Sequence, residues 1–353
     1  MFAAADSDYL KYSKLVPTIK IGETYIDFVP TAEHVGILRS VSCNLAHLQQ
    51  RVSSHQKALS GILSSGMARR HRANPLASLR AEKIYGIPVL FSGVATLILS
   101  KAEINVLDHQ VKKTIQNFLK LHQKTPDPVV FFLAGMLPGS AILHLKQLTI
   151  FGMVCRLPDN ILHKIAKEQL IVSGDRDSSW FSQVKHLCFT YNLPHPLILL
   201  DNPPPKQQFK ELVKTSIIDY WQTELRSKAN PIELPSLQYF KPQYMSLSRP
   251  HPLWSTCKTS YDVNKSIIQS RMLSGRYRVG SLLRHFSPSC SGICELCSAE
   301  TEDLAHLLLP RCVHLQERRT VLVEYWRSSE KTSSQMSSWQ HKMTKPFYQP
   351  SSN

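Results

Sequence analysis

Acidic residues are scarce in this sequence of 353 residues. Asp and Glu number 26 against 42 Lys and Arg, which gives a formal net charge of +16. This excess is larger than solubility requires, and it favours an anionic partner. RNA and DNA both satisfy that charge, and so does an acidic membrane surface.

The sequence also lacks a convincing membrane segment. The uncharged stretch between Lys83 and Lys101 has 17 residues, just under the roughly 18 to 20 that span a bilayer, and it contains Pro88. A buried core helix is expected there instead. Near the start, Asp6 and Asp8 stand where a secretory signal would carry basic residues. We therefore expect no membrane contact and an intracellular location, either nuclear or cytoplasmic.

Common catalytic motifs are missing as well. The sequence contains no Gly-x-Ser-x-Gly nucleophile turn, no Gly-x4-Gly-Lys-Ser/Thr phosphate loop and no His-Glu-x-x-His helix. The two glycines of "LAGMLPGS" have the wrong spacing for phosphate binding and predict a turn. No catalytic residue is therefore expected.

Eight cysteines are present, and half of them are scattered. Cys43, Cys155, Cys188 and Cys257 stand singly in apolar or mixed surroundings, which is typical of reduced, buried thiols. The other four lie in "CSGICELCSAETEDLAHLLLPRC", residues 290–312. Clustering of this kind in a reducing compartment indicates a metal site.

The spacing within this cluster favours structural zinc, Zn2+. Cys294, Cys297, His306 and Cys312 supply three thiolates and one imidazole, a common ligand set of tetrahedral zinc. Four protein ligands leave no open position for a reactive water, so such an ion would have no catalytic role. A Ser-rich loop without metal remains an alternative. Cys290 could also replace Cys294, and His285 or His314 could replace His306.

The remaining patterns predict a mainly α-helical protein with a small N-terminal β segment and a C-terminal Cys-Cys-His-Cys zinc knuckle. "LVPTIKIG", "TYIDFV" and "HVGILRS" have the composition of short strands, separated by Gly, Glu-Thr and Pro-Thr-Ala-Glu breaks. Helical spacing begins at Asn44, and the segment after Lys101 predicts a long amphipathic helix ended by Pro126 and Pro128. The expected divisions are 1–40 (β), 41–125 (helical), 126–285 (helical connector), 286–327 (zinc knuckle) and 328–353 (disordered tail).

Two basic stretches are candidate nucleic-acid contacts. The first holds Arg69, Arg70 and Arg72 at an expected helix end, where a solvated helix terminus is the simpler interpretation. The second, "QSRMLSGRYRVGSLLRHF", precedes the cysteine cluster and combines arginine with aromatic residues, as phosphate contact and base stacking require. Its candidate residues are Arg271, Arg276, Tyr277, Arg278 and Arg284. The alternative is that Tyr277 and Phe286 are core residues and the arginines are solvated.

Several blocks together give the chain a family resemblance. "HVGILRS" with "NLAHLQQRVSSHQKAL", then "HRANPLASLRAEKIYGIPVLFSG", "LAGMLPGSAILHLKQLTIFGMVCRLP", "SGRYRVGSLLRHF" and the cysteine cluster resemble the C-terminal part of a LINE-type, non-LTR retrotransposon reverse transcriptase. The resemblance covers roughly residues 12–327. It implies that residues 1–40 are the end of the polymerase palm, 41–125 a thumb, and the four metal-ligating residues a knuckle that grips template RNA or target DNA.

One departure from that family limits what the resemblance implies. A reverse transcriptase holds two Mg2+ ions with carboxylates, and this sequence has no Asp-Asp pair. Asp6 with Asp8, and Asp175 with Asp177, are better interpreted as solvated loop acids. We therefore expect a truncated, reverse transcriptase-like product that binds RNA or DNA and is not an enzyme. The alternative is a zinc-stabilised vestigial or protein-interaction product with no nucleic-acid role. The sequence indicates no oligomeric state.

Overall fold

The computed structural model confirms a mainly helical chain. It describes residues 19–26, 31–34, 37–40, 44–62, 64, 74–172, 179–230, 234, 237, 240–287, 289–308 and 312. The chain divides into two compact units, Met1–Gly275 (unit 1) and Arg276–Asn353 (unit 2). The expected disordered tail, 328–353, lies outside the described residues.

The N-terminal strands form two antiparallel pairs. β1 (Ile19–Ile21) pairs with β2 (Thr24–Ile26), and β3 (Thr31–His34) pairs with β4 (Ile37–Ser40). The sequence predicts a break at 30–33, yet most of that break is β3. β3 pairs with β4 in a register that places Thr31 opposite Ser40. These backbone hydrogen bonds stabilise a strand although the local sequence has a low β propensity. Whether these strands descend from a polymerase palm remains a prediction.

The helices of unit 1 begin close to their predicted starts. α2 is Leu45–Ile62 and α3 is Pro75–Ala81, which is capped by the Asn74 side chain accepting from the amide of Leu76 at 2.9 Å. The expected core helix of 84–100 is instead broken into a π-helical turn η2 (Glu82–Gly86), α4 (Ile87–Leu90) and a 3-10 turn η3 (Val94–Thr96). Gly93, at a φ of 73°, ends the helical path in the left-handed region that glycine tolerates.

α5 (Lys101–Leu119) has clear signals at both ends. Ser100 and Glu103 form a capping box at its start. The helix ends several residues before Pro126 and Pro128, its predicted end. It stops there because Lys120 adopts a left-handed conformation at a φ of 52°. There the amide of Leu121 donates to the carbonyl of Gln116 at 2.9 Å, which satisfies a helix-end acceptor.

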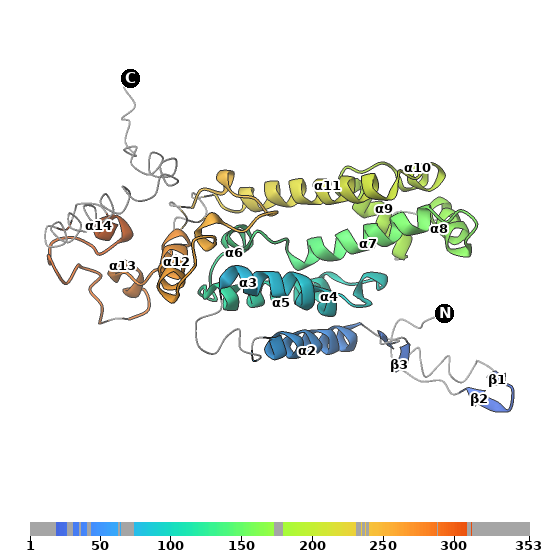
Figure 1. Ribbon diagram of the computed structural model, residues 1–353, viewed down its shortest axis with the longest axis horizontal. Helices are drawn as coiled ribbons and strands as arrows, with labels where there is room; N and C mark the ends of the chain where they lie inside the picture. The colour runs from blue at the N-terminus through green and yellow to red at the C-terminus, as the bar shows by residue number, and fades with distance from the viewer. Residues whose placement is uncertain are drawn as a thin grey trace, which may run out of the picture. The chain divides into compact units, whose positions relative to one another are not determined.

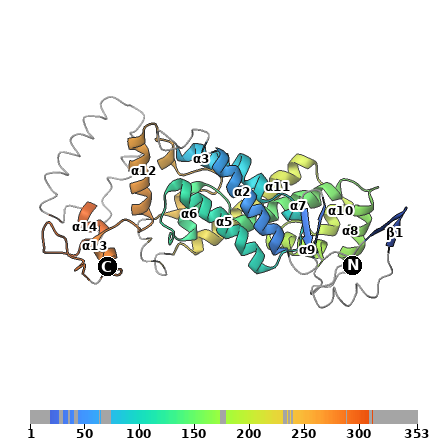
Figure 2. The same ribbon diagram turned by 90° about the horizontal axis from the view of Figure 1, so that it is seen from below.

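The remaining regular elements among the described residues are helices. In Figure 1, α7 lies beside both α5 and α11, and Figure 2 shows α2 next to α5. In unit 1 the further elements are α6 (Asp127–Ala134), α7 (Gly139–Cys155), α8 (Ile161–Val172), α9 (Trp180–Thr190), α10 (Pro196–Asp201), α11 (Lys206–Ser227), η5 (Pro242–Tyr244), η6 (Pro252–Trp254) and α12 (Ser260–Leu273); those of unit 2 are α13 (Gly280–Leu283) and α14 (Leu304–Leu308).

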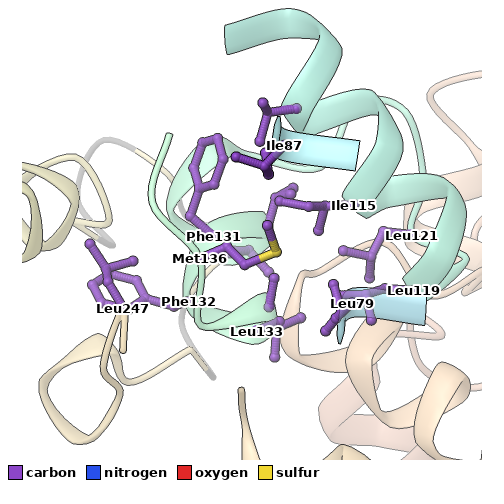
Figure 3. Packing of buried hydrophobic residues seen from close by; sticks show 14 of the residues in the cluster. Leu79, Ile87, Ile115, Leu119, Leu121, Phe131, Phe132, Leu133, Met136 and Leu247 are labelled. Carbon is purple, nitrogen blue, oxygen red and sulfur yellow. The ribbon is translucent and has the colours of Figure 1, made fainter. Parts of the chain in front are cut away.

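Unit 1 has two hydrophobic cores. The first joins α3 to α6 with the segment from Leu237 to Ile267, and Figure 3 shows Leu79, Ile115, Leu119 and Met136 within it. The second lies among α7 to α11. Trp254, fully buried, donates its indole N–H to the carbonyl of Leu133 at 3.0 Å. Residues of the predicted 41–125 module therefore share a core with the predicted connector.

The helices were compared with the length and apolar composition that a membrane-spanning segment needs. Within the described residues, no helix alone is long and apolar enough to cross a bilayer; α6 and α7, bent by 59° at their junction, pass that test as a pair on length and composition. Both helices also supply residues to the cores, including Phe132 and Phe151, which are fully buried.

A buried polar cluster joins three elements of unit 1. His55 on α2 and Glu82 on η2 are both fully buried, and Nε2 of His55 lies 3.0 and 3.1 Å from the two carboxylate oxygens of Glu82. Nε2 of Gln110 on α5 lies 3.1 Å from Nδ1 of His55. An amide nitrogen only donates, so Nδ1 accepts and Nε2 carries the proton that faces Glu82. The absence of a side chain at Gly86 provides space for the Glu82 carboxylate, since a Cβ atom there would lie 2.2 Å from a Glu82 oxygen.

We predict that Glu82→Ala lowers the free energy of unfolding by about 1 to 3 kcal/mol, because it leaves the buried Nε2–H of His55 without an acceptor. Urea unfolding measured by circular dichroism checks this value. The matched control is Asp201→Ala, which removes an exposed ion pair of 2.8 Å with Lys167 and should cost less than about 1 kcal/mol. Equal effects of the two substitutions would contradict the prediction.

Candidate metal centre

The first two candidate ligands lie in a tight turn of unit 2. Ile293 and Thr301 form an antiparallel bridge, and the amide of Cys294 donates to the carbonyl of Glu300 at 2.9 Å. The amide of Ser298 donates to the carbonyl of Cys294 at 2.8 Å, and Ser298 has a φ of 52°. This turn lies between the bridged residues Ile293 and Thr301, and it brings Cys294 and Cys297 close to each other.

His306 is positioned by the short helix α14. Oδ1 of Asp303 accepts the amide of His306 at 2.6 Å, so Asp303 caps the helix. The Nδ1 atom of His306 lies 3.1 Å from a carboxylate oxygen of Glu300. The other ring nitrogen, Nε2, lies 3.4 Å from the Sγ of Cys297. With Nδ1 bonded to the Glu300 carboxylate, Nε2 is available to bind a metal, which is the usual arrangement of metal-ligating histidines.

The four candidate ligands converge. The ligand atoms of Cys294, Cys297, His306 and Cys312 all lie within 4.8 Å of one another. A tetrahedral site with bonds of about 2.0 to 2.3 Å has edges of about 3.3 to 3.8 Å, so a small contraction closes it. Three of the ligands are almost fully buried, and Cys297 is half-buried. The cluster could therefore hold a metal ion, in the ligand set that the spacing predicts.

The alternative ligands are placed differently. Cys290 is half-buried, and its thiol donates to the carbonyl of Gly280 at 3.8 Å, away from the cluster. His285 is exposed. In the part of the chain that the structure describes, neither belongs to a metal-sized group. His314 lies outside the described residues.

The local electrostatics favour metal binding. Backbone amides of Ala299 and Glu300 lower the pKa of Cys297 to about 7, which increases the thiolate form that binds metal. For His306, burial works against protonation, but hydrogen bonds with Cys294, Glu300 and Cys297 outweigh it and raise the pKa. A bound cation would take the place of that proton on Nε2.

The turn that carries the cysteines also contacts α13. Oε1 of Glu302 accepts the amide of Gly280 at 3.2 Å, and the carbonyl of Glu302 accepts the amide of Ser281 at 2.9 Å. A Cβ atom at Gly292 would lie 3.2 Å from Cδ of Arg284, so the arginine stem packs closely over the turn. Sequence analysis missed the roles of Glu300 and Glu302, although a carboxylate beside paired cysteines is a usable signal for a second-layer partner of a metal site.

The predicted nucleic-acid residues do not all lie together. Arg69, Arg70 and Arg72 fall outside the described residues. Arg271 is on α12 of unit 1, where its Nη2 and Nε atoms donate to the carbonyl of Lys120 at 3.1 and 3.3 Å. This contact satisfies the C-terminal end of α5, so Arg271 has a structural role there.

The other four candidates belong to unit 2. Arg278 and Arg284 are exposed, while Arg276 and Tyr277 are half-buried. The Nε atom of Arg276 is buried, with no hydrogen-bond partner among the described residues. Phe286 is 63% exposed, so it is not the core residue that the alternative interpretation required. Arg278 and Arg284 are the more accessible cations of this group.

Comparison with known proteins identifies no relative. No protein-family model matches the chain, and neither the curated proteins nor the solved structures include a match.

We predict one tightly bound divalent metal ion per chain after purification without added metal, measured by elemental mass spectrometry. Cys297→Ser should remove it, because a hydroxyl is a poor replacement for a thiolate ligand. Cys290→Ser is the matched control and should keep the full metal content, since that thiol lies outside the cluster. Equal metal content in the two variants would rule out the assignment.

Proposed function

We propose that the cluster is a structural zinc site. Three thiolates and an imidazole are the soft ligand set that favours Zn2+ over Mg2+ or Ca2+. The four protein ligands fill a tetrahedron, so no position remains for a reactive water. Zinc here would hold the backbone of unit 2 in place, and we assign it no catalytic step.

We further propose that unit 2 binds RNA or DNA through the basic surface of Arg276, Tyr277, Arg278 and Arg284. The observation that carries this proposal is the pair of hydrogen bonds from Gly280 and Ser281 to Glu302, next to the cysteine turn. These bonds fix α13, which ends directly before Arg284. A metal in the cluster would then keep the arginines in one geometry for phosphate groups.

The resemblance to the C-terminal part of a LINE-type reverse transcriptase supports this proposal, since a knuckle that grips nucleic acid is the usual role of that region. By the same resemblance, α2 to α5 would be thumb-like, and β1 to β4 the end of a palm. We assign no polymerase activity to this chain, because its sequence contains no Asp-Asp pair. The competing proposal, a zinc-stabilised product without a nucleic-acid role, predicts no binding at low salt.

The salt dependence of binding tests the proposed surface. Each phosphate contact adds about 0.7 to the slope of log affinity against log salt for a single strand. Replacing both Arg278 and Arg284 by Ala should therefore lower that slope by about 1.4 if both contact phosphate. Fluorescence anisotropy with a labelled single-stranded oligonucleotide at several salt concentrations measures this change.

A matched control removes the same charge elsewhere. Lys210 and Lys214 are exposed on α11 in unit 1, and replacing both by Ala should leave the slope close to that of the parent. Metal content and circular dichroism should be the same in both double variants. If the two variants have equal slopes and affinities, the arginines are only solvated side chains, and the competing proposal becomes the better one.

A further inference from the structure

Unit 1 contains a polar cavity that the proposed nucleic-acid surface does not use. It has a volume of about 360 Å3 and lies among α5, the start of α6, the entry to α7 and α11. That volume is at the lower end of the range typical of small-molecule sites. Its walls include Asp108 and Lys112 from α5, Asp127 from α6, Trp221 from α11, and Lys228, which directly follows α11.

The two lysines of the cavity already have anionic partners. Nζ of Lys112 lies 2.5 Å from a carboxylate oxygen of Asp127. Nζ of Lys228 lies 2.9 Å from Glu224, one turn earlier on the same helix. Each cation is therefore balanced by a neighbouring carboxylate, and neither provides an unmatched positive charge for an anionic ligand.

Asp108 is different, because no ion pair to it exists among the residues that the structure describes. Its Oδ1 atom accepts the amide of Ser140, near the start of α7, at 2.7 Å, and the amide of Gly139 also hydrogen-bonds this carboxylate. A carboxylate can accept about four hydrogen bonds, so it has capacity left. Burial, more than any other cause, raises the pKa of Asp108, and the nearby Asp127 adds to this effect, while hydrogen bonds from Ser140 and Gly139 partly oppose it. A bound cation would remove that penalty.

The apolar side of the cavity also suits a cation. Trp221 is partly exposed, and its indole N–H donates to the hydroxyl of Tyr191 at 3.1 Å, which fixes the ring. The buried Phe131 lies on another wall. Aromatic rings attract ammonium and guanidinium groups, and the attraction increases as water is excluded.

We propose that this cavity binds a small organic cation, a primary ammonium or guanidinium group on a short apolar stem, with Asp108 as its counter-ion and Trp221 beside the stem. The site would be separate from the nucleic-acid surface of unit 2, so the proposal does not depend on the proposed function. A site for a cation in a chain of net charge +16 requires a local carboxylate such as Asp108.

Three probes of the same size and different charge test the proposal: n-butylammonium, n-butanol and butyrate, titrated calorimetrically into the full chain at fixed ionic strength. We expect n-butylammonium to bind at least about tenfold more tightly than the other two, since only it pairs with Asp108. Failure of n-butylammonium to bind, or stronger binding of butyrate, would overturn the proposal.

Two variants locate the site. Asp108→Asn should weaken n-butylammonium binding by about tenfold or more, while Asp201→Asn, which alters an exposed carboxylate on α10, should leave it unchanged. Because Asp108→Asn also affects the start of α7, Asn105→Trp provides a second test. Asn105 is an exposed residue of the cavity wall, so a tryptophan there takes up cavity volume while Asp108 is kept. Wild-type binding in a folded Asn105→Trp protein, or equal weakening by Asp201→Asn, would show that the cation binds elsewhere.

Discussion

The structure of unit 2 depends on how its four candidate ligands are held together. In the described part of this unit, the buried apolar side chains other than cysteine are Val279 and Leu304. So small a core cannot offset the conformational entropy of ordering the segment, and small units of this kind are usually held by disulfides or metals. The cysteine and histidine side chains occupy the centre where a core would otherwise be. A bound metal would thus supply most of the stability of this unit.

Unit 1 is stabilised differently. Its two cores contain large, fully buried side chains such as Trp254, Phe132 and Phe151. Its polar interior includes paired groups, for example His55 with Glu82, and capped helix ends such as that of α5. Removal of a metal from unit 2 should therefore leave the cores of unit 1 unaffected. With a metal bound in unit 2, the two units would gain their stability from separate physical sources.

Local signals explain how much of this could be predicted from sequence. The cysteine spacing acts within one short segment, and the structure brings those ligands together. The Asn74 cap and the capping box of Ser100 and Glu103 are also local features, although the sequence predictions did not use them. The missed features depend on distant contacts. The early end of α5 is stabilised in part by Arg271, and the strand at Thr31 by pairing with β4. The contact of Glu302 with Gly280 spans 22 residues, and local sequence periodicity does not report it.

A metal in the cysteine cluster would fix α13 and Arg284, the residue that follows it. Amide hydrogen exchange of the full chain, with its metal and after chelation, measures whether α13 depends on that ion. We predict that the amides of Ser281 and Arg284 lose protection when the metal is removed, while those of α5 and α7 in unit 1 keep theirs. Unchanged protection of α13 in the metal-free protein would contradict the account.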